Sequence, residues 1–181
     1  MTAYYINSKY VSNTASFSQI VFNNFLYLEN VGLNHNIEEI NRLLNSDSFM
    51  GYFIYKDSVE TKNLVGYLIG EYISLNDGRY VYFINYFYMS SKHRSKGLGT
   101  QLMNYCIKQC TEKKGIKFIM LYCNSENNTI VNYYKKFGFI KDINMNEPEY
   151  TDLSLLGNKV IYPDSNTMDP KSPHIIMTLF I

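Results

Sequence analysis

The sequence has no tryptophan and contains only three cysteines and four prolines among its 181 residues. The cysteines are odd in number and poorly spaced for a disulfide framework, so they predict buried, reduced thiols. No histidine adjoins them in the sequence, so we expect no metal site. The chain also lacks an uninterrupted apolar run of about 18 residues and a signal-peptide pattern, so we expect a soluble, cytoplasmic protein with no membrane partner.

The sequence also lacks an excess of charge of either sign. The 17 Lys and Arg residues balance 16 Asp and Glu residues, which leaves a formal net charge of +1. A nucleic-acid binder carries a basic excess or a basic stripe, so this balance argues against a nucleic-acid partner. The hydrophobic fraction is 46% and the charged fraction 18%, which indicates a packed core rather than a disordered chain. The length predicts one domain over residues 1–181.

The spacing of apolar residues predicts a mixed α/β protein. Helices are expected at residues 17–30, 37–44 (with Asn36 as the N-cap), 98–114 and 127–137. Strands are expected at residues 50–55, 64–73, 80–89, 117–123, 140–143 and 174–181, with a hairpin turn at 76–78. A meander of hairpins that feeds a strand–helix–strand unit predicts a mixed sheet with helices on both faces.

The segment that joins strand 80–89 to the next helix carries the strongest chemical signal. Gly97 and Gly99 lie at the start of that helix, where backbone N–H groups are unpaired and the dipole is positive. Glycines let an anion approach these groups closely, so the pattern predicts a phosphate or pyrophosphate ligand. Basic side chains add positive charge at the same place: Lys92, His93, Arg94 and Lys96. The alternative is a glycine turn that only opens a helix, beside a solvated basic rim.

Two motifs resemble those of the GNAT superfamily of acyl-CoA-dependent N-acetyltransferases. Residues 94–99 (RSKGLG) match its pattern R/Q-x-x-G-x-G/A. Residues 127–139 resemble its second signature, N-x-x-A-x-x-x-Y-x-x-x-G-F, with Ile130 at the alanine position. Residues 64–67 (LVGY) look like the family's preceding strand. The resemblance implies a GNAT-like fold, with a central twisted mixed sheet of six to seven strands flanked by helices on both faces.

The resemblance also implies acetyl-CoA as cosubstrate. Its pyrophosphate is expected on the backbone amides of Arg94, Ser95, Lys96, Gly97, Leu98, Gly99 and Thr100. Its pantetheine arm is expected to pair with the end of the preceding strand, at Phe87, Tyr88 and Met89. Asn127 aligns with the family asparagine that contacts the pantetheine region.

The implied reaction is direct attack of a neutral primary amine on the thioester carbon, through a tetrahedral intermediate. Tyr134 occupies the family's tyrosine position and is the candidate general acid, also in contact with the cosubstrate, although its helical phase is equally typical of a core residue. Strand 80–89 contains no carboxylate, so the base is open. The candidates for the base or for a water path are Glu71, Tyr86 and Tyr122; Glu71 reads equally as a solvated edge residue and Tyr122 as a core aromatic residue.

The acceptor side carries less information. Residues 144–173 form a long connection before the last strand and hold all four prolines. Such a loop is expected to be a flap near the acceptor, an oligomer contact or a surface insertion. We expect an N-acetyltransferase that acts on a small-molecule or protein amine, as a monomer or a homodimer. The alternative is a catalytically inactive GNAT-fold module that binds acyl-CoA or another protein.

Overall fold

The computed structural model describes residues 2–8, 13–27, 35–74, 80–113, 115–141 and 174–181. The expected hairpin turn at 76–78 and the long connection at 144–173 lie outside the described residues. None of the described helices is both long and apolar enough to cross a membrane.

Apart from β1, η2 and η3, the order of helices and strands agrees with the prediction from the sequence. The elements are β1 (Tyr4–Asn7), α1 (Thr14–Asn24), α2 (Ile37–Leu44), β2 (Phe49–Lys56), η2 (Thr61–Asn63), β3 (Leu64–Ser74), β4 (Tyr80–Met89), η3 (Ser91–His93), α3 (Leu98–Glu112), β5 (Ile116–Asn124), α4 (Asn128–Lys135), β6 (Ile140–Lys141) and β7 (His174–Phe180). Strand β1 was not predicted. Helix α1 begins three residues earlier than predicted, because the Asn13 side chain accepts a hydrogen bond from the Ser16 amide at 2.8 Å and caps it.

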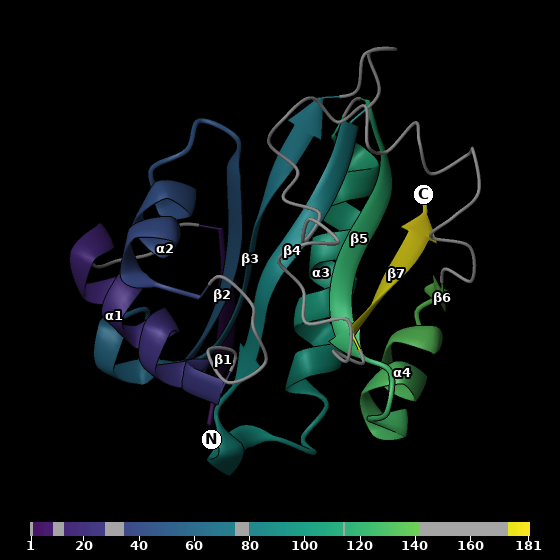
Figure 1. The fold of residues 1–181 in the computed structure, drawn as a ribbon. Coiled ribbons are helices and arrows are strands. Elements are labelled where there is room, and N and C mark those ends of the chain that lie inside the picture. The colour runs from purple at the N-terminus through teal and green to yellow at the C-terminus, as the bar shows by residue number, and fades with distance from the viewer. Residues whose placement is uncertain (1, 9–12, 28–34, 75–79, 114, 142–173) are drawn as a thin grey trace.

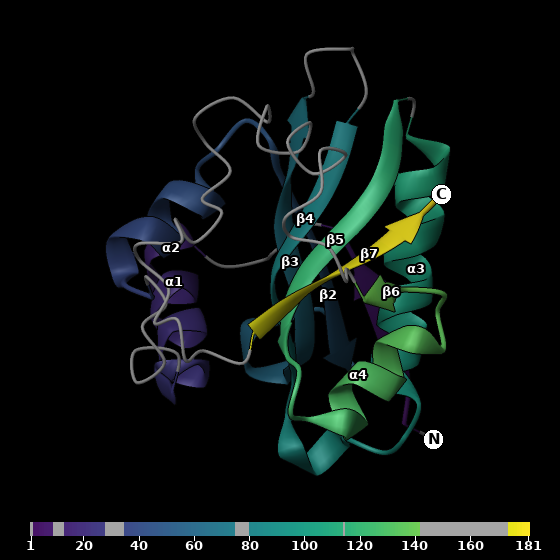
Figure 2. The same ribbon diagram turned by 45° about the vertical axis from the view of Figure 1, so that its right-hand side comes forward.

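The strands form one sheet in the order β1-β2-β3-β4-β5-β7-β6. Strands β4 and β5 run parallel, joined by α3, whereas β4 pairs with β3 and β5 pairs with β7 in antiparallel fashion (Figure 1). Figure 2 shows α1 and α2 on one side of this sheet and α3 and α4 on the other. The predicted mixed sheet with helices on both faces is therefore confirmed.

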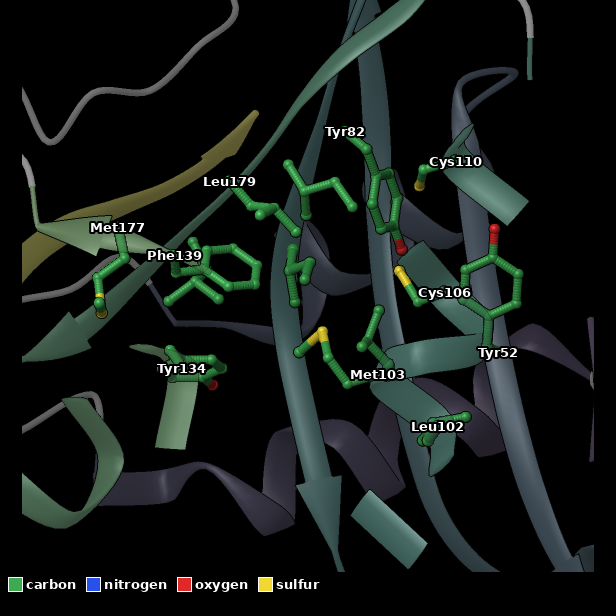
Figure 3. Packing of buried hydrophobic residues seen from close by; sticks show 14 of the residues in the cluster. Tyr52, Tyr82, Leu102, Met103, Cys106, Cys110, Tyr134, Phe139, Met177 and Leu179 are labelled. Carbon is green, nitrogen blue, oxygen red and sulfur yellow. The ribbon is translucent and has the colours of Figure 1, made fainter. Parts of the chain in front are cut away.

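Two apolar clusters join the helices to the sheet, and a third, smaller one consists of the strand residues Val81, Met120 and Ile176. The cluster under α1 and α2 contains Phe17, Val21, Ile40, Leu43, Phe53, Tyr55, Tyr67 and Ile69. The cluster under α3 and α4 is larger, and Figure 3 shows part of it. It includes Cys106 and Cys110, which are buried and free, as is Cys123, so the prediction of buried, reduced thiols is confirmed.

Candidate functional site

A β-bulge bends β4 in the middle of the sheet. Tyr86 pairs with Ile69 and Ile84 pairs with Gly70, so Asn85 is an extra residue with no partner across β3. A Cβ atom on Gly70 would lie 1.9 Å from the Phe83 carbonyl oxygen. The bulge is therefore compatible only with glycine at position 70, and it increases the local twist of β4.

The bulge coincides with the point where β4 leaves β5. Pairing between the two strands runs from Tyr80 to Ile84 on β4 and ends at Leu121 on β5. Both strands continue beyond it, β4 to Met89 and β5 to Asn124, and Figure 1 shows their ends diverging. Beyond this point the facing backbone groups of β4 and β5 do not pair with each other. This arrangement suits an extended ligand that pairs like a strand.

The N-terminus of α3 follows the free end of β4. Gly97 has φ of +74° and precedes the helix without a side-chain cap, and Ser95 has φ of +60°. The first helical hydrogen bond runs from the Gln101 amide to the Gly97 carbonyl, at 3.0 Å. Within the described part of the chain, the amides of residues 98–100 have no backbone partner, so this turn can accept an anion.

Arg94 and the lysines give this turn its geometry and its charge. The Arg94 Nε donates to the Met89 carbonyl at 2.9 Å, which ties the turn to the end of β4. The pKa of His93 is lowered, first by desolvation and then by the positive charges of Lys96, Lys56 and Lys92. The same positive field favours a bound phosphate.

Tyr133 of α4 faces this region. A Cβ atom on Gly99 would lie 3.3 Å from the Tyr133 hydroxyl, and Tyr133 forms a ring contact with Phe87 at 6.1 Å. Burial raises the pKa of Tyr133 to about 12. Tyr133, which the sequence did not single out, therefore lies at the first turn of α3.

Tyr134 is buried, with an exposed fraction of 9%. It packs edge-to-face on Phe139 at 5.7 Å, and Figure 3 shows it at the edge of the apolar cluster. Burial raises the pKa of Tyr134 above its ordinary value, and smaller contributions in the same direction come from Cys123, Tyr133 and Tyr27. The hydroxyl therefore stays protonated at neutral pH, as a proton donor requires.

Asn127 lies at the start of α4, where its Oδ1 accepts a hydrogen bond from the Ile130 amide at 3.2 Å. This side chain therefore caps the helix that carries Tyr134. Its expected contact with pantetheine stays a prediction.

The three candidates for the base occupy different places. Glu71 is on β3 opposite Phe83, before the bulge, where it lies 3.6 Å from Arg42 and accepts from the Ser48 hydroxyl at 3.3 Å. Tyr122 is on β5 and forms an edge-to-face contact with Phe83. Only Tyr86 lies directly after the bulge, on the part of β4 that has left β5.

Tyr86 has a buried partner that the sequence analysis missed. The Tyr86 hydroxyl lies 3.1 Å from Nδ1 of His35, and Nε2 of His35 lies 3.0 Å from the Phe22 carbonyl oxygen. His35 is only 4% exposed. Its position, 51 residues before Tyr86 and just ahead of the α2 cap, gives no local signal of this contact. In the described residues, no cluster of His, Cys, Asp or Glu side chains is suited to a metal ion.

Comparisons with known proteins point to one family. A family model described as the acetyltransferase (GNAT) family matches residues 17–139. No curated protein matches the chain. The fold is similar to solved structures over nearly the whole of both chains, at low identity. Examples are NAA60 of Arabidopsis thaliana in complex with acetyl-CoA (TM-score 0.66, 11% identity, 99% of each chain covered) and the ribosomal-protein-S18-alanine N-acetyltransferase of Escherichia coli (TM-score 0.63, 14% identity, 99% of this chain and 94% of that chain). A third is Ard1 of Thermoplasma volcanium (TM-score 0.61, 16% identity, 99% of this chain and 98% of that chain).

Proposed function

Because the chain belongs to the GNAT family of acetyltransferases, we propose that it transfers the acetyl group of acetyl-CoA to a primary amine. The observation that carries the proposal is the divergence of β4 and β5 directly beside the unpaired amides of α3. A diphosphate and an amide-bearing arm joined in one molecule fit these two features together. We treat residues 1–181 as one acetyltransferase domain.

The cosubstrate is proposed to lie along the end of β4. The amides of residues 95–100 bind the diphosphate, aided by the field of Lys92 and Lys96. The Arg94 amide, which the sequence placed in this set, instead donates to the Ser91 carbonyl at 3.4 Å. The pantetheine arm pairs with residues 87–89 along the edge of β4 that β5 has left. A backbone N–H of this strand end polarises the thioester carbonyl and binds the oxyanion that forms on attack more strongly than it binds the carbonyl.

Tyr134 is proposed as the general acid. An ordinary phenol has a pKa of about 10 and a thiol of about 8.5, so protonation of a thiolate by a phenol is not downhill. Burial raises the pKa of Tyr134 further, so its contribution comes from position: it holds a proton at the departing sulfur throughout the reaction. Its buried ring, packed on Phe139, fixes that position.

The acceptor is proposed to be a primary amine, with peptides as the first class to test. The E. coli relative is named for the acetylation of an alanine in ribosomal protein S18, and Naa50 of Arabidopsis thaliana was solved with the bisubstrate analogue CoA-Ac-MVNAL. These names support peptides with a free α-amino group as acceptors. Polyamines, aminoglycosides and free amino acids complete the panel.

Two measurements, made one after the other, test the function. A ligand that binds only the folded state stabilises it by about 2.7 kcal/mol at 100 times its Kd, so acetyl-CoA is expected to raise the Tm. Release of the CoA thiol is then measured over the amine panel. No Tm shift at millimolar acetyl-CoA contradicts the proposal. A Tm shift without thiol release from any amine identifies the inactive acyl-CoA-binding alternative.

A further inference from the structure

We propose that His35 accepts, through the hydroxyl of Tyr86, the proton that the acceptor amine must lose before it attacks. This role rests on the acetyl transfer proposed above. An ammonium has no lone pair, so some group must take its proton. Three observations carry the assignment: the two hydrogen bonds of His35, the place of Tyr86 on β4, and an unused hydrogen-bond acceptor on the neighbouring Asn85.

The contacts of His35 fix its tautomer. The Phe22 carbonyl oxygen can only accept a hydrogen bond, so Nε2 of His35, 3.0 Å away, must carry a proton. In the neutral ring, Nδ1 then has a free lone pair, and the Tyr86 hydroxyl at 3.1 Å donates to it. The ring is stacked on Phe22 at 5.2 Å, with an interplanar angle of 8°, which holds this orientation. The Phe22 carbonyl also stabilises the imidazolium that forms when Nδ1 takes a proton.

Tyr86 connects this histidine to the point where the strands diverge. It is the second residue after Ile84, the last residue of β4 that pairs with β5. Its ring packs with the α1–α2 cluster, 5.0 Å from Phe25, whereas the next residue, Phe87, packs with the α3–α4 cluster. Tyr86 and Phe87 thus face opposite sides of the same strand end. The relay places the acceptor amine on the Tyr86 side.

Asn85 supplies the second polar group at this point. The bulge leaves Asn85 without a partner on β3, and its Oδ1 is buried with no hydrogen bond among the described residues. A buried acceptor without a donor is costly, and an ammonium group offers three donors. An amine that bound to this oxygen would bind at the bulge, one residue before Tyr86 in the chain.

The proton moves in one balanced step. The ammonium gives one proton to Tyr86 Oη while Tyr86 gives its own proton to Nδ1 of His35, so the phenol is neutral before and after. The amine then forms the N–C bond, and the C–S bond breaks. Tyr134 gives its proton to the CoA sulfur, and the second N–H proton of the former amine replaces it on Tyr134. The imidazolium of His35 later releases its proton to solvent. Acetyl transfer from an ammonium thus yields the amide, free CoA and one proton.

The charged groups around the pair favour this relay over ionisation of Tyr86 alone. The pKa of Tyr86 is raised to about 12, mainly by burial and to a smaller extent by the negative charge of Glu39 on α2. Glu39 is itself paired with Arg42 at 2.8 Å. A free phenolate is therefore rare at neutral pH, and Tyr86 can accept a proton only as it passes one to His35.

The test is the pH dependence of kcat/KM for His35→Gln, with the amine of the panel that turns over fastest. Glutamine can accept from Tyr86 and donate to the Phe22 carbonyl, but it cannot take a proton. At neutral pH we expect a loss of about 100-fold. The variant then depends on amine that is already neutral, so the defect shrinks about tenfold per pH unit up to the pKa of the amine. Tyr86→Phe is expected to show the same slope, and the double variant no further loss.

A structural control separates chemistry from packing. Phe17→Leu truncates another buried ring of the α1–α2 cluster, one that packs on Phe53 and Tyr67, so it lowers the Tm and leaves the pH profile unchanged. Folding of each variant is checked by the Tm shift with acetyl-CoA; if His35→Gln does not fold, Tyr86→Phe carries the test. A variant with the wild-type profile, or a loss that is equal at every pH, overturns the relay while wild-type activity upholds the transferase. Wild-type protein that acetylates no amine overturns both.

Discussion

Substitution of Gly97 by alanine separates the strain of the α3 turn from its function. Gly97 has φ of +74°, where an L-residue costs about 1–2 kcal/mol. A Cβ atom there would meet no heavy atom within 4 Å, so no clash with the protein adds to this cost. For a domain of this size, about 1 kcal/mol corresponds to about 2–4 °C, so Gly97→Ala is expected to lower the Tm by about 2–8 °C.

The effect on acetyl-CoA is expected to be separate from the effect on stability. The added methyl group would stand in open space beside amides that have no backbone partner. A hydrogen bond to a charged group contributes about 1.5–3 kcal/mol, so displacing one contact with the diphosphate raises the Kd by about 10- to 150-fold. Gly97→Asn is the matched variant, because asparagine tolerates a positive φ but still carries a side chain.

The Kd for acetyl-CoA is measured by calorimetric titration, and the Tm by thermal unfolding, for the wild type, Gly97→Ala and Gly97→Asn. We expect Gly97→Asn to recover most of the Tm, and both variants to bind acetyl-CoA weakly. If the asparagine variant binds as tightly as the wild type, the diphosphate does not lie on the turn at residues 94–100.

Three other substitutions test single features of the site. Tyr134→Phe is expected to lower kcat without changing the KM for acetyl-CoA, because the buried ring keeps its packing; an unchanged kcat removes Tyr134 from the acid role. Gly70→Ala places a Cβ 1.9 Å from the Phe83 carbonyl and is expected to cost about 3 kcal/mol or more in denaturant unfolding. A denaturation midpoint of Gly70→Ala equal to that of the wild type would show that β4 does not need its bulge. Asn127→Ala removes the α4 cap and is expected to cost about 1 kcal/mol, measured as the Tm; a loss of acetyl-CoA affinity with an unchanged Tm would instead favour the pantetheine contact.

Much of the fold was predictable because it follows from local patterns. The apolar face of α3, with Leu102, Cys106 and Cys110, repeats at helical spacing and is buried as expected. Strand β4 has the same bounds in the prediction and in the structure. Strand β1 escaped prediction because it is short, and because its partner, β2, lies more than 40 residues further along the chain.

The candidate site was predictable only where it is a property of one segment. The turn at Gly97 carries its own signal, since glycine is the residue that adopts a positive φ without cost. The bulge at Asn85 depends on Gly70, a residue of the neighbouring strand, and the contact of His35 with Tyr86 depends on how α1 and α2 fold over the sheet. Tyr134 satisfied the core pattern and the family pattern at once, and in the structure it is a buried residue of the core.

The sheet keeps the two apolar clusters apart, and this has a consequence for how specificity can change. Tyr86 and Tyr88 pack with α1 and α2, whereas Phe87 and Met89 pack with α3 and α4. Substitutions on opposite faces share few partners, so their free energies add. With the acceptor placed as we propose, a new acceptor preference can be selected by randomising the α1–α2 face alone, while recognition of the nucleotide carrier is inherited unaltered from the other half of the molecule.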